Sequence, residues 1–202
     1  MAEYIPELIK EMENIEGRIR QLSSEIQELK KQEEESRDKE KKKALTVKIE
    51  QLKNEKNSAQ KEVQTIWNMI LNRIPSFIKG ENQKEMIESC REFGRRFKNN
   101  NLTTSQIRNV YGEVKKIQMK SSMLKEDENI DILPLRMLLP KLAYSAARAK
   151  KKGTDELKDI LSKGIETVLE NETDSKEVLK RFEMFSNFFE AILAYHKAEG
   201  GN

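Results

Sequence analysis

The sequence predicts an all-α protein, a compact bundle of about five helices preceded by an antiparallel coiled-coil hairpin. Apolar residues recur at steps of three and four along most of the 202 residues, which is the period of one helix face. Alternating patterns, which are typical of half-buried strands, are absent. We expect two domains, a coiled-coil helical hairpin arm over residues 1–78 and a helical-bundle domain over residues 79–202.

The first third of the chain predicts the hairpin. Apolar residues at alternating steps of four and three form a coiled-coil seam that ends at Leu29, and a second seam begins at Leu45 after a highly charged segment. The distance from Leu29 to Leu45 does not fit the alternating steps of four and three. One straight helix through both segments would therefore have the two seams on different faces. We therefore predict helices near residues 3–33 and 43–73 that pack antiparallel, with Pro75 ending the second.

Short amphipathic helices with polar connections follow from residue 81. The first ends at the three asparagines of residues 99–101. The next begins at Thr103, because Thr103 and Gln106 have the spacing of a capping box. The apolar seams of these two helices are Met86, Cys90, Phe93 and Phe97 in the first, and Ile107, Val110, Val114 and Ile117 in the second.

The segment LPLRMLLPKLAYSAARAKKKG predicts a further helix. Pro134 suits its first turn, Pro140 should kink or restart it, and Gly153 suits its end. Two more helices complete the bundle. Their seams are Leu157, Leu161, Ile165 and Val168 in one, and Val178, Phe182, Phe185, Phe189 and Ile192 in the other.

Composition narrows the class of protein. No stretch approaches the ~20 consecutive apolar residues of a membrane span, and the acidic, amphipathic start is unlike a secretory signal peptide. We therefore expect a cytoplasmic protein without a membrane partner. Cys90 is the only cysteine, which excludes an intramolecular disulfide framework and a cysteine zinc site. Its position on a seam predicts a buried structural thiol.

The only histidine, His196, lies one step of four beyond Ile192 and so extends the apolar stripe of the last helix. This position favours a packed ring with one nitrogen hydrogen-bonded, and a polar contact with a partner chain or a phosphate is the alternative. A catalytic histidine needs an orienting acid and a nucleophile, but Glu190 lies off this face. Without phosphate-binding glycine motifs or metal-ligand spacing, we expect no enzyme activity, no cofactor and no metal.

The net charge of +3 is unevenly distributed. Residues 1–78 are neutral, residues 79–152 carry a net charge of +8, and residues 153–202 carry one of −5. In the basic region, cationic and aromatic side chains recur at helical spacing on three successive helices. Such rows are typical of surfaces that neutralise phosphates and stack on bases. The candidate RNA-binding residues are Arg91, Arg95, Lys98, Arg108, Lys115, Lys116, Lys141, Tyr144, Arg148 and Lys151. Ordinary solubilising charge is the alternative interpretation.

Three segments, LTTSQIRNVYGEVKKI, LPLRMLLPKLAYSAARAK and FEMFSNFFEAILAYHKAEGG, occur in this order between residues 79 and 202. They resemble the small subunit of type III-A CRISPR effector complexes, the Csm small subunit. The resemblance implies an all-α subunit without catalysis of its own, which stacks head to tail along the guide RNA and its target RNA. It also implies the backbone and large subunits of the effector complex as partners. The residues that it singles out are Arg108, Lys115, Lys116, Lys141, Arg148, Tyr195, His196 and Lys197.

The hypothesis from sequence is thus a non-catalytic, RNA-binding, filament-forming subunit of a type III-A CRISPR interference complex. We expect it to contact the guide and target backbones without reading bases, and to self-associate in a filament, with a homodimer as an alternative when isolated. A coiled-coil scaffolding protein without nucleic-acid binding is the alternative function. The hairpin arm lies outside the resemblance, and three roles stay open for it: a lineage-specific extension, an oligomerisation device or an additional RNA-binding element. Its zero net charge disfavours the last.

Overall fold

The computed structural model describes residues 4–125 and 128–200, and within them every regular element is a helix. This confirms the predicted all-α class. The chain divides into two compact units, Met1–Ile70 and Leu71–Asn202. None of the helices in the described residues is long and apolar enough to cross a membrane.

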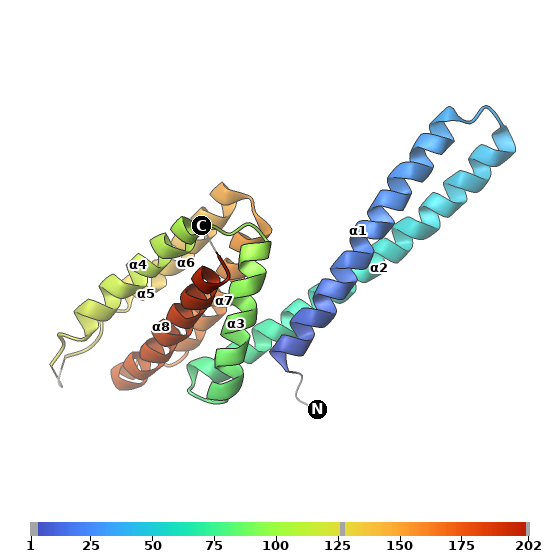
Figure 1. The fold of residues 1–202 in the computed structure, drawn as a ribbon. Coiled ribbons are helices and arrows are strands. Elements are labelled where there is room, and N and C mark those ends of the chain that lie inside the picture. The colour runs from blue at the N-terminus through green and yellow to red at the C-terminus, as the bar shows by residue number, and fades with distance from the viewer. Residues whose placement is uncertain (1–3, 126–127, 201–202) are drawn as a thin grey trace. The chain divides into compact units, whose positions relative to one another are not determined.

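The first unit is a helical hairpin. Helix α1 spans Ile5–Glu35 and helix α2 spans Lys39–Ile78, and a short turn joins them (Figure 1). Pro6 lies at the start of α1, where a residue without an N–H breaks no helical hydrogen bond. The predicted start of this helix near residue 3 lies outside the described residues.

Antiparallel packing of the hairpin follows from its contacts. Ile26 and Leu29 of α1 form a buried cluster with Ile49 of α2, and Leu45 and Leu52 pack against it. Two ion pairs cross the hairpin on its exposed flanks. They join Arg18 to Glu55 at 2.6 Å and Lys48 to Glu25 at 3.3 Å. Higher numbers in one helix meet lower numbers in the other, as the two predicted seams require.

The prediction that Pro75 ends the second helix is wrong, because α2 continues to Ile78 with Pro75 inside it. A proline within a helix forfeits one backbone hydrogen bond and costs about 3 kcal/mol. Here Ile74, Phe77 and Ile78 on either side of the proline are fully buried. Burial of each such side chain contributes about 1.5–3 kcal/mol, so packing in the second unit offsets the local cost.

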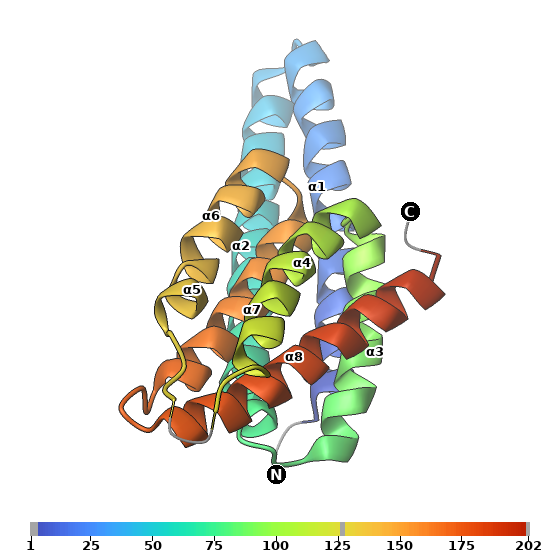
Figure 2. The ribbon, with the colours of Figure 1, turned by 90° about the vertical axis from the view of Figure 1, so that its left-hand side faces the viewer.

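In the described residues, the second unit consists of the end of α2 and six further helices (Figure 2). Helix α8 packs against α3, α4 and α7, and α6 packs against α4 and α7. The bounds are Gln83–Asn99 for α3, Thr104–Ser121 for α4, Leu133–Arg136 for α5, Leu138–Ala149 for α6, Lys152–Leu169 for α7 and Ser175–Ala198 for α8.

Phenylalanine rings fill the core of this unit. Phe188 of α8 contacts Phe77 and Phe93 at centroid distances of 6.1 and 6.3 Å. Cys90 is fully buried, and its thiol donates to the Phe188 carbonyl at 3.5 Å. This confirms the predicted buried thiol.

Glycine lets α3 and α8 approach each other closely. A Cβ on Gly94 would lie 2.6 Å from the backbone nitrogen of His196 and 2.8 Å from the carbonyl carbon of Tyr195. Cβ atoms do not approach other atoms so closely, so the crossing of these helices depends on a residue without a side chain at this position.

Local signals in the sequence place several helix boundaries correctly. Thr103 and Gln106 form the predicted capping box at the start of α4. Pro134 lies in the first turn of α5, and the helix restarts at Leu138 so that Pro140 falls in the first turn of α6. Both prolines thus occupy positions where their missing N–H groups are tolerated.

Gly153 does not end that helix, contrary to the prediction. Helix α6 ends at Ala149, and Lys150 adopts the left-handed conformation with φ of 51° that commonly follows a helix. Gly153 instead lies in the first turn of α7, where a Cβ would come within 3.0 Å of the Phe97 and Asn100 carbonyl oxygens. Its role is close packing against the end of α3.

Candidate nucleic-acid interface

The predicted basic residues of α3 lie on the side of the helix opposite its apolar seam. Arg91 and Lys98 are exposed. Arg95 is half-buried and donates to Glu92 one turn earlier, at 2.9 Å. Two of the three predicted cations of this helix thus extend into solvent.

On α4 the predicted residues differ in how far they are available to a ligand. Arg108 is exposed. The Lys115 ammonium lies 3.0 Å from Glu190 of α8 and 5.3 Å from the centre of the Tyr111 ring. Tyr111 also donates to Glu190, at 2.6 Å, so the carboxylate holds both side chains.

Burial and the hydrogen bonds of this cluster shift the pKa values of Glu190 and Tyr111 in opposite directions. The Tyr111 and Lys115 hydrogen bonds lower the pKa of Glu190. Burial and the bond to Glu190 raise the pKa of Tyr111. Lys115 thus helps to dock α4 on α8, which sequence spacing alone did not reveal.

Helix α6 presents the most open of the predicted rows. Tyr144 has 68% of its surface exposed, and Lys141 and Arg148 are exposed on the same side at helical spacing. Lys151 is half-buried and precedes the first residue of α7, where its carbonyl accepts from Thr154 at 3.0 Å. Lys151 is therefore less exposed than Lys141, Tyr144 and Arg148, and it lies outside their helix.

Glu113 connects α4 to α6. It accepts hydrogen bonds from Lys116, at 2.6 Å, and from Lys141. The two ammonium groups lower the pKa of Glu113 to about 2. One carboxylate between two lysines leaves this group with a net positive charge.

Exposed apolar side chains lie on α4 and in the segments that connect it to α6. Because α4 and α6 run antiparallel (Figure 2), Arg108 near the start of α4 and Arg148 near the end of α6 lie at the same end of the pair. At its other end the exposed apolar residues are Met119, Met123, Leu133 and Met137. We call the whole surface the α4–α6 face, with a basic end and an apolar end.

The structure gathers some of the ten predicted residues and separates others. Arg108, Lys116, Lys141, Tyr144 and Arg148 lie on the α4–α6 face. The residues of α3 are placed apart from it, because α3 packs against α7 and α8 and lies across the unit from α6 (Figure 2). The rows therefore form at least two separate basic areas.

His196 is fully buried, and its Nε2 lies 2.9 Å from the Leu102 carbonyl oxygen. A carbonyl only accepts, so Nε2 carries the proton, and Nδ1 has no hydrogen-bond partner in the part of the chain that the structure describes. Burial lowers the pKa of His196 and keeps the ring neutral. The predicted packed ring with one hydrogen-bonded nitrogen is confirmed.

A buried ion pair beside this interface was missed by the sequence analysis. Arg96 of α3, only 1% exposed, donates to both carboxylate oxygens of Glu156 on α7, at 3.1 and 2.6 Å. Asn100 donates to the same carboxylate at 2.9 Å. Burial raises the pKa of Glu156, and the positive charge of Arg96 opposes this effect. The pair locks α3 to α7 beneath the exposed cations of α3.

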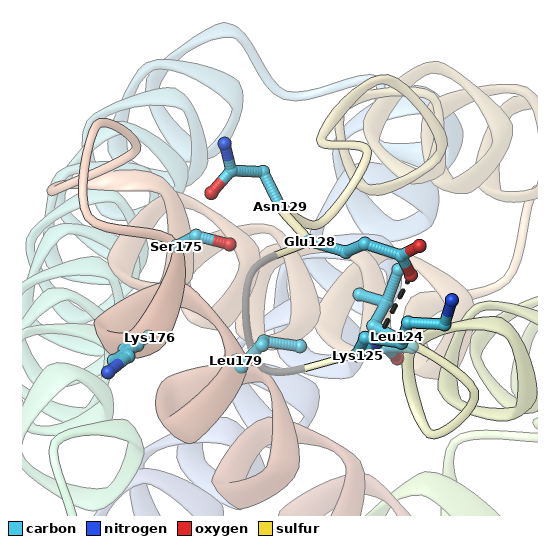
Figure 3. Close-up of a pocket in the computed structure, with 8 residues that line it drawn as sticks. Leu124, Lys125, Glu128, Asn129, Ser175, Lys176 and Leu179 are labelled. Carbon is cyan, nitrogen blue, oxygen red and sulfur yellow. Dashed lines mark hydrogen bonds between the residues drawn. The ribbon is translucent and has the colours of Figure 1, made fainter.

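An open pocket of about 710 Å³ lies between the end of α4 and the start of α8 (Figure 3). Glu128 accepts from the Lys125 backbone there, at 3.1 Å, and Ser175 accepts from the Ile130 backbone at 2.9 Å. Figure 3 shows the Glu128 carboxylate and the Lys176 ammonium pointing away from each other. These groups satisfy the local backbone and do not converge on one point. In the described residues, no cluster of three histidine, cysteine or acidic side chains could hold a metal ion.

Comparison with known proteins identifies a family for most of the chain. The family model described as Csm2 Type III-A matches residues 80–202, which is more than half of the chain and includes α3 to α8. No curated protein and no solved structure matches the chain. The match begins at residue 80, after the hairpin, so residues 1–79 lie outside it.

Proposed function

This chain belongs to the Csm2 Type III-A family, and from that membership we propose that it binds RNA and forms filaments within its complex. The family makes it a structural subunit of a type III-A CRISPR complex, with the other effector subunits as partners. Its ligands in this proposal are the guide RNA and the target RNA. The subunit contributes no catalytic group of its own and works in the cytoplasm. The hairpin of residues 1–78 and the bundle of residues 79–202 act as separate domains.

The basic end of the α4–α6 face is the observation that carries the proposal. Arg108, Tyr144 and Arg148 are exposed or largely exposed there, and Lys116 and Lys141 flank a single carboxylate. Arginine forms paired hydrogen bonds with phosphate oxygens, and a tyrosine ring stacks on any base. An arrangement of this kind suits a sugar-phosphate backbone and imposes little sequence preference.

The apolar end of the same face supports a protein neighbour beside the RNA. Exposed methionine and leucine side chains that lie together are typical of interaction surfaces. We propose that another subunit covers them while RNA lies along the basic end. The acidic residues of 153–202 and the basic residues of 79–152 favour head-to-tail contacts between copies. Sedimentation at increasing salt should show such assemblies dissociating.

The RNA proposal is tested with a charge-neutralised variant and a matched control. Arg108→Gln with Arg148→Gln removes two cations from the face, and Lys84→Gln with Lys180→Gln removes two exposed cations elsewhere in the unit. Each lost phosphate contact should reduce the slope of log affinity against log salt by ~0.7 for single-stranded RNA. We therefore expect the face variant to lose about 1.4 in slope and the control to lose little.

Fluorescence anisotropy with a labelled RNA of mixed sequence provides both slopes. Equal slopes for the two variants would exclude the α4–α6 face as the RNA site. An isolated protein that binds no RNA at low salt but captures an acidic protein would instead support the scaffolding function.

A further inference from the structure

The hairpin arm is neutral as a whole, but its two helices carry opposite charges. Helix α1 has five basic and nine acidic residues, a net of −4. The part of α2 up to Ile70 has eight basic and four acidic residues, a net of +4. Packed helices lie about 8–10 Å apart, which is close to the Debye length of ~8 Å at physiological salt. An anion on the surface of α2 is therefore attracted to it with only partial cancellation from α1.

A groove in the arm concentrates this positive charge. It has a volume of about 280 Å³ and is lined by Ile26, Lys30, Lys53, Lys56, Asn57 and Gln60. Three ammonium groups and two side-chain amides surround one apolar contact, and no acidic side chain lines it. Lys30 comes from α1 and the other polar residues come from α2.

Two of these three lysines have no ionic partner among the described residues. Lys30 and Lys56 form no ion pair there, and Lys53 lies 3.4 Å from Glu50, whose side chain is 63% exposed. An exposed pair of this kind is worth ~0–1 kcal/mol and exchanges readily with another anion. The groove thus holds positive charge that the arm itself does not neutralise.

Lys56 is also unusual for its place in the hairpin. It lies in the line of Leu45, Ile49, Leu52 and Ala59, where apolar residues form the seam, and it is half-buried. A lysine at a seam position lowers the stability of a coiled coil, although it can specify register. Binding of an anion would be a second role for Lys56, beside specifying the register.

The shape of the groove indicates the class of ligand. Lys53 to Gln60 extends along α2 by about 10 Å at ~1.5 Å per residue, which is longer than one phosphate group. A strand can thus place more than one phosphate along the groove, which a single phosphate ion cannot do. We propose that the groove formed by Lys30, Lys53 and Lys56 binds the phosphate backbone of an RNA strand and so makes the arm a second RNA-binding element.

This inference extends the proposed RNA binding to a part of the chain that the family match does not include. Its test compares two triple variants of the full chain with equal changes in charge. Lys30→Gln, Lys53→Gln and Lys56→Gln remove the groove cations, whereas Lys31→Gln, Lys42→Gln and Lys61→Gln remove three exposed lysines elsewhere on the arm. With single-stranded RNA, the groove variant should lose about 2 in salt slope at ~0.7 per contact, and the control variant should keep the slope of the unmodified protein.

Acetylation of lysines, read by mass spectrometry with and without RNA, locates the contacts in the unmodified protein. We expect RNA to protect Lys30, Lys53 and Lys56 and to leave Lys61 reactive. Protection of Lys141 on the α4–α6 face without protection in the groove would overturn this inference and leave the proposed function intact. Protection of neither set would overturn both. Equal protection of the groove by a polyglutamate peptide would identify an acidic protein as its ligand and overturn the assignment to RNA.

Folding of the arm is followed separately through Trp67, the only tryptophan, which is 7% exposed and lies within the first unit. The groove variant should melt at the same temperature as the control or higher, because it removes repulsion among lysines. If it loses RNA affinity only in proportion to a loss of folded arm, Lys56 has a structural role and the groove is not a site.

Discussion

The two units bury apolar surface with helices in different ways, and their charged residues consequently behave differently. In the arm each helix has one partner, so only a narrow seam is covered and the crossing ion pair of Arg18 and Glu55 stays 60% and 42% exposed. In the second unit α8 packs against α3, α4 and α7, and the pair of Arg96 and Glu156 is almost completely removed from solvent. An arginine–glutamate ion pair is thus screened by water in the arm and shielded from water in the second unit. The difference follows from the number of helices that pack around the pair.

The largest expected effect breaks the buried pair. Arg96→Met leaves the Glu156 carboxylate buried without its partner, which should lower the free energy of unfolding by about 3–5 kcal/mol. Urea unfolding monitored by far-UV circular dichroism measures it, while Trp67 fluorescence follows the arm. The double variant Arg96→Met with Glu156→Leu should recover most of the loss. A single variant as stable as the unmodified protein would show that the pair is not the lock between α3 and α7.

The next effect concerns close packing. Gly94→Ala places a methyl group against the backbone of α8 and should lower the free energy of unfolding by about 1–3 kcal/mol. Gly112→Ala is the matched control, since among the described residues nothing beyond its chain neighbours and the backbone of its own helix lies within 4 Å of the position of its Cβ. Alanine is a better helix former, so this control should gain about 0.5–1 kcal/mol. Equal changes in the two variants would contradict the proposed crossing of α3 and α8 at Gly94.

A smaller effect depends on pH and is confined to the second unit, because the arm contains no histidine. Burial lowers the pKa of His196 in the folded state below its unfolded value of ~6.5. Its contribution to stability is therefore complete above pH ~6.5 and is lost as the pH falls through the folded pKa. The hydrogen bond to the Leu102 carbonyl partly opposes the shift.

His196→Gln isolates this contribution, since glutamine does not titrate. Denaturation midpoints measured from pH 7 to 5 should fall more steeply for the unmodified protein than for the variant. Parallel curves would show that the ring titrates equally in the folded and unfolded states.

The smallest effect is expected in the arm. A double-mutant cycle on Arg18→Ala and Glu55→Ala should give a coupling energy of about 0.2–1 kcal/mol, because both groups are largely hydrated. The coupling should decrease further in high salt. A value as large as that of Arg96 and Glu156 would contradict the explanation by exposure.

Local chemistry allowed much of the fold to be predicted. The Thr103 capping box, the seam position of Cys90 and the step from Ile192 to His196 each depend on residues within a few turns of one helix. The predictions for Pro75 and Gly153 failed because distant packing outweighs a local preference. Burial of Phe77 keeps the helix intact beyond the proline, and the contact with α3 requires a glycine inside α7.

The candidate site was predictable in part. Helical spacing correctly places Tyr144 and Arg148 on one exposed row. Spacing does not reveal that Glu190 holds Lys115 or that Glu113 bonds Lys141, because each of these bonds depends on how two helices dock. The bond between Glu113 and Lys116 is different, since the two residues lie three apart on α4. Arg96 and Glu156 are 60 residues apart, so their pairing follows only from the tertiary structure. RNA binding by any of these residues stays a prediction.

The burial of Cys90 has a practical consequence for experiments on both units. Its thiol is enclosed by the phenylalanine core, and burial raises its pKa far above that of a free cysteine, so little reactive thiolate forms at neutral pH. A cysteine introduced at an exposed position should therefore react with maleimide dyes while Cys90 does not. Spectroscopic labels can thus be attached to the arm, the α4–α6 face or both without first removing the native cysteine, which would leave a cavity in the core.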